Sequence, residues 1–155
     1  MARDRKPWIS KDRLVRRLQD LLAMEYEDVF LYMWEASLFK KRLGGGDSLH
    51  HRFSLLSSTE MRHADRLVGL LISLELKPIW DFKTPRRIPS VRESLNRHLE
   101  REFEAIRIYQ ELVEETGEWP HFQTVLKGIL EDEKNHLKVV RHMIRGLGAG
   151  SGGPL

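Results

Sequence analysis

The sequence predicts an all-α fold, a four-helix bundle with one long crossover between the second and third helices. Apolar residues recur at intervals of three and four along four long segments, which is the spacing of amphipathic helices. The first and third connections are short, so the helices that they join are predicted to be antiparallel. The middle connection, residues 77–90, contains three prolines, and an extended chain of this length can reach about 45 Å. The second and third helices are therefore predicted to run parallel.

Start and stop signals bound the first pair of helices. The first helix is predicted from a cap at Ser10 to about Leu43, where the glycines at 44–46 end it. The second is predicted from residues 47–48 to near Leu76, just before a proline.

The second pair is bounded in the same way. "SVRE" is a capping box, with Ser90 as the N-cap and Glu93 three positions later. This third helix is predicted to end near residues 116–117. The fourth is predicted to begin around Pro120, a favourable first-turn residue, and to end near Gly146.

The bundle is predicted to occupy residues 10–146 as one domain. A basic arm at residues 1–9 precedes it, and a flexible Gly-rich tail at 147–155 follows it. The net charge is +3 and the pI about 9.3. A basic arm can bind an anionic partner, but we interpret these early charges as the solvated start of a helix and expect no nucleic-acid partner.

Composition excludes several classes of site. The chain has no cysteine, which excludes disulfides, zinc–thiolate sites, iron–sulfur clusters and a catalytic thiol. It has no apolar run of about 18 residues and no apolar leader segment at its start. We therefore expect no membrane association and a cytoplasmic location.

The predicted apolar seam of each helix is interrupted near its middle by ionisable residues. The first seam passes through either Asp28 or Val29, and the third through Leu99, Ile106 and Val113. The interrupting residues are Glu25 on the first helix, Glu60 and His63 on the second, Glu102 on the third, and Glu133 and His136 on the fourth.

Four ionised carboxylates in an apolar interior are prohibitively costly unless they are paired or bound to metal. Protonation with a raised pKa is one remedy. Salt bridges are a second, but the seams carry no Lys or Arg at these heights. Only a pair of divalent cations uses all six residues, because four carboxylates balance two such ions and the imidazoles add neutral nitrogen ligands. The pattern therefore favours a dinuclear metal centre.

The spacing of these residues supports the same interpretation. Glu and His at positions i and i+3 project from one helix face. Two helices supply Glu-x-x-His and the other two supply one Glu each, which is the di-iron carboxylate set of ferritin-like bundles. The chain is also an internal repeat: "TEMRH" matches "DEKNH", and Leu-x₂-Glu-x₆-Tyr occurs twice. The members of that second motif are Leu22, Glu25 and Tyr32, then Leu99, Glu102 and Tyr109.

On these motifs the chain resembles the bacterioferritins. "STEMRHADRLVGLLISLELKP" carries that family's second-helix pattern, while "LLAMEYEDVFLYMW" and "ILEDEKNHL" match its first and fourth helices at the key positions. The resemblance covers roughly residues 14–143. It implies a ferroxidase that oxidises Fe(II) with O₂ or peroxide, for iron storage or detoxification. In that centre Glu25 and Glu102 are terminal ligands, Glu60 and Glu133 bridge the irons, and His63 and His136 are the nitrogen ligands.

Three alternative functions are weighed against this resemblance. A rubrerythrin-type peroxidase or oxidase carries a further Glu three residues after the third-helix ligand, and here that position is Ala105. An oxygenase needs an open substrate pocket beside the metals, of which the sequence shows no sign. A DNA-protecting mini-ferritin usually places its ligands between subunits, whereas this set is complete within one chain.

Residues outside the metal set also carry predictions, one of them from the resemblance and the others from their spacing. Met61 occupies the position of the methionine that binds haem between two bacterioferritin subunits, although it could simply pack there. Tyr32, and with less support Tyr109, is predicted to hydrogen-bond a ligand carboxylate. The remaining histidines are predicted at the surface or at an interface: His50, His51, His98, His121 and His142.

One departure concerns assembly. Bacterioferritins continue into a short fifth helix that helps to build a 24-subunit cage, whereas this chain ends in "RGLGAGSGGPL", and glycine disfavours helix. We expect a homo-oligomer, either a dimer or a cage, whose partners are Fe(II) and O₂ or H₂O₂. The site could also hold manganese.

Overall fold

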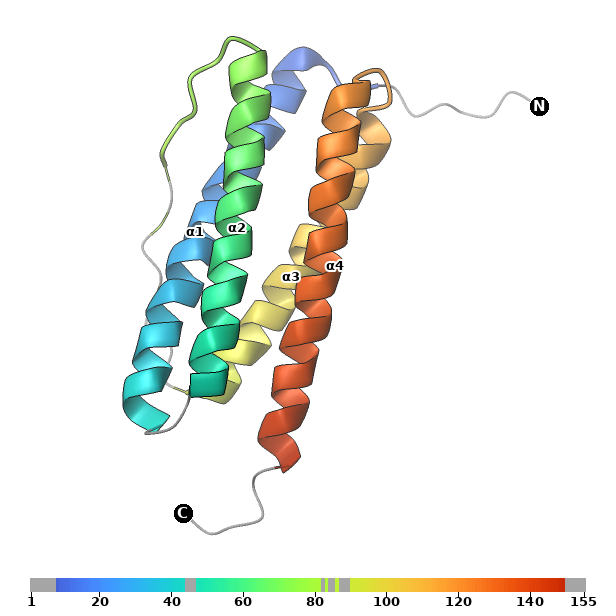
Figure 1. Cartoon of the computed structure of the whole chain (residues 1–155). Helices are drawn as coiled ribbons and strands as arrows, with labels where there is room; N and C mark the ends of the chain where they lie inside the picture. Colours follow the sequence, from blue (N-terminus) through green and yellow to red (C-terminus); the bar gives the residue numbers. More distant parts are fainter. Residues whose placement is uncertain (1–7, 44–46, 82, 84–85, 87–89, 150–155) are drawn as a thin grey trace, which may run out of the picture.

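The computed structural model describes residues 8–43, 47–81, 83, 86 and 90–149. Within them the chain forms a bundle of four helices, which confirms the predicted all-α fold (Figure 1). None of these helices has the length and apolar character needed to cross a membrane. The helices are α1 (Lys11–Leu43), α2 (Asp47–Ser73), α3 (Val91–Glu115) and α4 (Pro120–Ala149).

The connections produce the predicted topology. Helix α1 packs along α2, and α3 packs along α4, each pair antiparallel. Residues 74–81, which follow α2, turn back along the outside of the bundle, and α2 and α3 run in the same direction (Figure 1). Helices α2 and α4 approach each other less closely than the helices of either antiparallel pair do.

Helix α2 ends three residues before the predicted Leu76, in a Schellman motif. The Leu76 N–H donates to the Leu71 carbonyl at 3.1 Å, and the Glu75 N–H donates to the Ile72 carbonyl at 2.8 Å. Glu75 has φ of 61°, the left-handed conformation that this motif requires and that glycine adopts most easily. The turn therefore satisfies the last carbonyls of the helix at the cost of strain at Glu75.

The other helix ends agree more closely with the sequence pattern. The Glu93 N–H donates to Ser90 Oγ at 3.2 Å, which confirms Ser90 as the N-cap of α3. Helix α4 continues to Ala149, three residues beyond the predicted end at Gly146. Residues 150–155 and 1–7 lie outside the described part of the chain.

Two residues of the predicted N-terminal arm pack on the bundle. Ile9 is buried, and its N–H donates to the carbonyl of Glu115 at 3.2 Å. The ring of Trp8 lies so close to Gly117 that a Cβ there would collide with it. The start of α1 is thereby fixed against the end of α3.

Two apolar clusters fill the bundle, one on each side of its middle. One joins the N-terminal half of α1 to the C-terminal half of α2 and includes Leu67 and Leu126. The other lies toward the opposite end and includes Phe53 and Val140. Burial of these side chains supplies the main favourable term in folding, and the ionisable residues lie between the clusters.

The predicted seam of α3 was wrong in part. Leu99, Ile106 and Val113 are only partly buried, because the helix is rotated toward the neighbouring stripe. His98 belongs to that stripe and is fully buried, so its predicted surface position was also wrong. The buried residues of α3 are Ser94, Leu95, His98, Glu102, Ala105, Tyr109 and Leu112.

Replacement of Glu75 with glycine should stabilise the protein. Glycine adopts the left-handed conformation without steric cost, so Glu75→Gly should raise the free energy of unfolding by about 1 kcal/mol. Urea unfolding followed by circular dichroism measures the change. Glu75→Ala is the matched control and should give no gain, because alanine keeps the Cβ; equal stabilisation by both variants would contradict the explanation.

Candidate metal centre

The structure brings all six predicted metal ligands together at the middle of the bundle. Each helix contributes from its inward face, and each of the six side chains is buried, with at most 5% of the residue exposed. Four of them come from the two Glu-x-x-His turns on α2 and α4, where the i, i+3 spacing places both groups over one turn. The six are Glu25, Glu60, His63, Glu102, Glu133 and His136.

Two of the carboxylates lie between the two imidazoles. Glu60 places one oxygen 2.9 Å from His63 Nδ1 and the other 2.9 Å from His136 Nδ1. Glu133 does the same, at 2.9 Å from His63 Nδ1 and 3.4 Å from His136 Nδ1. These two glutamates can therefore share two cations.

The remaining carboxylates each belong to one half of the centre. Glu25 lies 3.5 Å from His63 Nδ1, and Glu102 lies 3.8 Å from His136 Nδ1. In each half, one oxygen or nitrogen from every residue lies within 4.8 Å of the others. The halves are Glu25 with Glu60, His63 and Glu133, and Glu102 with Glu60, Glu133 and His136.

Several atoms that face the centre lie close to one another, but none of them makes a hydrogen bond of good geometry with a described residue. Buried polar atoms are almost always paired in native proteins, so several such atoms converging on one point require an explanation. A divalent cation explains them, because carboxylate oxygen and imidazole nitrogen are common donors to such ions. These atoms are Glu60 Oε2, His63 Nδ1, Glu102 Oε2, Glu133 Oε1 and His136 Nδ1.

Without a cation, the centre holds protons instead. Burial raises the pKa of Glu25 and Glu102 well above the ordinary range, and the nearby Glu133 charge adds to this. Burial disfavours a charged imidazole, but contacts with Glu133 and Glu60 nevertheless raise the pKa of His136 to about 11. The pKa of His63 is raised for the same reason. Binding of cations must therefore displace protons.

Two tyrosines link the halves of the internal repeat crosswise. Tyr32 on α1 donates to Glu102 Oε1 on α3 at 2.6 Å, and Tyr109 on α3 donates to Glu25 on α1. Both rings are fully buried. Each copy of Leu-x₂-Glu-x₆-Tyr thus holds the carboxylate of the other copy, and Tyr109 has the same kind of contact as Tyr32.

Sequence reasoning missed the residues that orient His63 from outside the centre. Asp132 Oδ2 lies 3.3 Å from His63 Nε2 and 3.3 Å from Arg66 Nη1. A carboxylate at Nε2 selects the tautomer that leaves Nδ1 free for a cation. Asp132 directly precedes Glu133 in "DEKNH", but its role depends on the contact between α2 and α4, which the sequence pattern does not report.

Two further ionisable pairs beside the centre were also missed. Asp28 accepts a 2.5 Å hydrogen bond from Arg101 Nε. The fully buried His98 places Nε2 2.5 Å from Glu35 Oε2, and its ring stacks on Tyr32 with centroids 3.9 Å apart. Asp28 and Glu35 lie on the same helix face as Glu25, because positions 25, 28, 32 and 35 are three or four residues apart. This spacing could have predicted that both side chains point inward.

Met61 lies apart from this centre. It is on α2 directly after Glu60, but its side chain points outward and is 44% exposed. Of the other predicted surface histidines, His51, His121 and His142 are exposed, and the partly buried His50 contacts the Ala36 carbonyl.

The metal-free protein should lose stability as the pH rises. Burial raises the pKa of Asp28 from 3.8 to about 7, against the opposing charge of Arg101. A carboxyl with a higher pKa in the folded state stabilises the fold fully below its unfolded pKa, and this contribution is lost as the pH rises through the folded value. The melting temperature in chelator should therefore fall between about pH 5 and pH 7.

The control for this pH dependence is Asp28→Asn, which keeps the shape but cannot titrate. Its melting temperature should fall less steeply over the same range. A wild-type melting temperature that rises with pH, or a variant with the wild-type slope, would show that Asp28 does not hold its proton in the folded state.

Comparison with known families gives a result that agrees with this geometry. The family model of the ferritin-like domain matches residues 15–148, which run from the first turns of α1 nearly to the end of α4 and contain all six buried residues. No curated protein matches the chain. A family match over most of the sequence shows that the chain belongs to the ferritin-like family.

Proposed function

We propose that the protein is a ferroxidase that oxidises Fe(II) with O₂ or peroxide for iron storage or detoxification. The observation that carries the proposal is the convergence of four buried carboxylates and two imidazoles with unpaired donor atoms. Their combined charge suits two divalent ions, and the family to which the chain belongs often includes ferroxidases.

The positions of the six side chains support a division of roles. Glu60 and Glu133 contact both histidines, which suits ligands shared by two irons. Glu25 and Glu102 each lie in one half of the centre, which suits a ligand of one iron. His63 and His136 supply one nitrogen to each half.

The protein orients the ligand side chains, encloses the centre between apolar clusters and holds protons on its carboxyl groups. Tyr32 and Tyr109 fix the outer carboxylates, and Asp132 fixes the ring of His63. The apolar clusters on either side of the centre bound it along the length of the bundle. Protons held by Glu25 and Glu102 must leave when Fe(II) enters. Bound iron supplies the electrons that reduce the oxidant.

Two observations favour this function over a mini-ferritin and over a rubrerythrin-type peroxidase. All six residues come from one chain, unlike the inter-subunit site of a mini-ferritin. Ala105 is buried on the inner face of α3, at the position where a rubrerythrin carries an additional glutamate. The donor set is therefore that of a bacterioferritin-type centre.

Removal of a shared or nitrogen ligand should abolish catalysed iron oxidation. Glu60→Ala and His136→Ala each remove a donor on which one or both ions depend, so stopped-flow absorbance should show Fe(II) oxidation no faster than in buffer. Zn²⁺ titration should at the same time show fewer than the two ions expected for the wild type. Glu100→Ala, on the exposed face of α3, is the matched control and should behave as wild type.

Wild-type oxidation rates in Glu60→Ala or His136→Ala, with an intact helical spectrum, would refute the assignment of this centre. Loss of oxidation in Glu100→Ala as well would show that the effect is not specific to the buried donors.

We also propose that Met61 binds haem between two copies of the chain. Its exposed thioether is accessible to a second copy. Other exposed apolar residues lie on α1 and α2, namely Met33, Trp34 and Ile72. The purified protein should show a Soret band that is absent in Met61→Leu, while Met33→Leu keeps it. Equal haem content in wild type and Met61→Leu would discard this assignment.

A further inference from the structure

The two approaches to the metal centre differ, although the repeat makes their frameworks equivalent. Superposition of "TEMRH" on "DEKNH" pairs His63 with His136. The flanking positions do not match: Asp132 corresponds to Thr59, Arg66 to Val139, and Gly128 to Leu55. The side chains that surround the outer edge of each histidine are therefore different in size and charge.

The approach to His63 is closed. Arg66 lies along α4, with Nη1 3.7 Å from the place where a Cβ on Gly128 would stand, and bonds to Asp132. Asp132 in turn contacts His63 Nε2. This ion pair covers the ring, whose side chain is 0% exposed.

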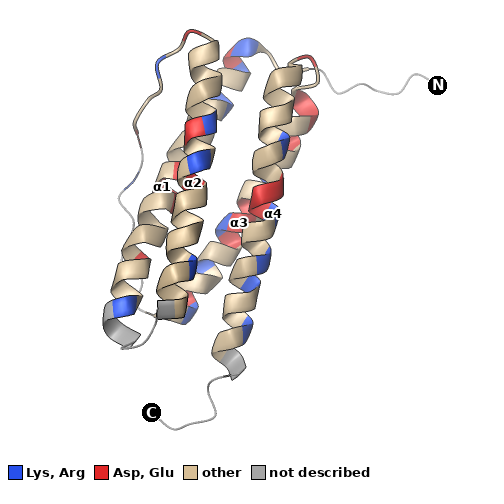
Figure 2. Ribbon diagram, viewed as in Figure 1, with Lys and Arg blue, Asp and Glu red and all other residues tan. Residues whose placement is uncertain are grey.

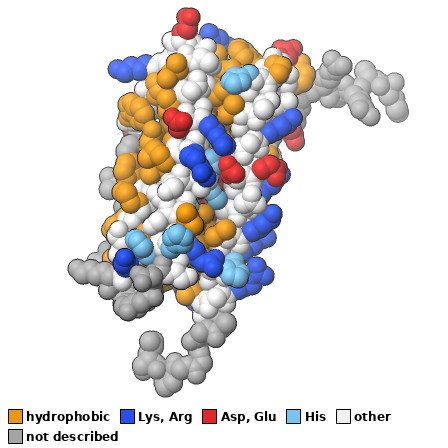
Figure 3. Space-filling model, in the orientation of Figure 1, with side chains coloured by type: hydrophobic (Ala, Val, Ile, Leu, Met, Phe, Trp, Pro, Cys, Tyr) orange, Lys and Arg blue, Asp and Glu red, His pale blue; other side chains and the backbone are white. Residues whose placement is uncertain are grey.

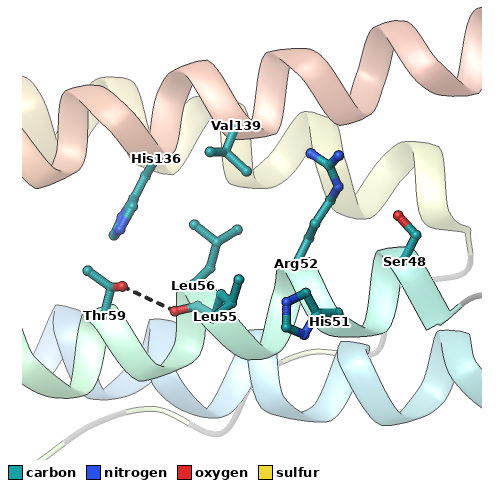
Figure 4. Close-up of a pocket in the computed structure, with 8 residues that line it drawn as sticks. All are labelled: Ser48, His51, Arg52, Leu55, Leu56, Thr59, His136 and Val139. Atoms are coloured by element: carbon teal, nitrogen blue, oxygen red, sulfur yellow. Dashed lines mark hydrogen bonds between the residues drawn. The ribbon is translucent and has the colours of Figure 1, made fainter.

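The approach to His136 is open. A cavity of about 450 Å³ lies between α2 and α4 (Figure 4). Val139 borders it, at the position that is equivalent in the repeat to the longer Arg66. His136 points into it from α4 above Thr59 (Figure 4), and its side chain is 6% exposed. The cavity size falls within the range of small-molecule sites, roughly 300–1,000 Å³.

The lining of this cavity favours an anion with an apolar body. Next to His136 the walls are Leu55, Leu56 and Val139, and beyond them Arg52 reaches from α2 across the cavity toward α4 (Figure 4). None of the described lining residues is acidic, and no described carboxylate pairs with Arg52. A cation entering from outside would meet the positive charge of Arg52 before it reached His136.

The surroundings extend the positive charge outward. A second hollow of about 320 Å³ shares Arg52 and is bordered by His142. Basic residues recur along the C-terminal half of α4, and basic and histidine side chains gather around this end of the molecule (Figures 2 and 3). The outer mouth of the cavity therefore attracts anions.

We propose that this cavity binds a medium-chain aliphatic carboxylate, with its head on Arg52 and its chain directed toward His136. Arg52 lies eight residues before Glu60, so the head and the centre are about 12 Å apart along α2. A chain of the length of decanoate spans that distance over Leu55, Leu56 and Val139. That the far end of the aliphatic chain lies beside bound metal ions rests on the proposed function. The binding of the carboxylate in the cavity does not depend on that function.

The test is calorimetric titration of the full-length, metal-free protein with decanoate. The wild type should bind saturably at one site. Arg52→Gln should weaken binding by at least about tenfold, because it removes a charge-assisted hydrogen bond. Val139→Phe should abolish binding by filling the cavity. Arg92→Gln, exposed on α3, is the matched control and should bind as the wild type does.

The outcomes separate this proposal from the ferroxidase. The absence of saturable binding, or wild-type affinity in Arg52→Gln, would overturn it. Phosphate binding as tightly as decanoate, or 1-decanol binding as tightly, would overturn the need for both head and chain. Fe(II) oxidation, measured in parallel, should be unchanged in Arg52→Gln, so failure of iron oxidation in the wild type would leave the binding result standing.

A second readout tests the direction of the bound chain. In Co(II)-loaded wild-type protein, decanoate should change the visible absorption of the metal, since the chain ends beside His136. Val139→Phe should show no change. An unaltered spectrum in saturated wild-type protein would overturn the proposed orientation.

Discussion

The structure depends on the burial of four carboxylates and two imidazoles in the middle of an apolar bundle. Burial of ionised groups without a partner is too costly to persist, so the centre must hold either protons or cations. Burial raises the pKa of Glu25 and Glu102, which favours the first state. The unpaired atoms of Glu60, Glu133 and the histidines are the donors that allow the second. Cation binding at this centre would therefore be coupled to folding through one set of residues.

The internal repeat explains how a chain of this length builds such a centre. Each helix pair contributes one single glutamate and one Glu-x-x-His, and the tyrosine of each pair holds the single glutamate of the other pair. This exchange needs α1 and α3 to face each other, which the long crossover between α2 and α3 permits (Figure 1). The repeat is thus a device that makes each half of the bundle support the ligands of the other.

Departures from the repeat give the two halves different surroundings. Arg66 and Asp132 close the outer edge of His63, whereas Thr59 and Val139 leave a cavity beside His136. Near Tyr32 the chain buries the hydrogen-bonded pair of Glu35 and His98. Among the described residues no such pair lies near Tyr109, because the repeat places Leu112 and Leu21 at the equivalent positions. A symmetric framework with asymmetric access gives the candidate metal centre two distinct environments.

The sequence by itself determined the four helices, their order and the six residues of the centre. Helical periodicity shows which residues share a face, and an acidic group on an apolar face is conspicuous in the pattern alone. Only the tertiary structure decided the rest. The rotation of α3 about its axis buries His98 in place of Leu99. The packing of α2 beside α4 places Asp132 next to His63 and leaves the cavity beside His136. These features depend on distances between helices, and a one-dimensional pattern carries the period of each helix but not its rotation or its separation from its neighbours.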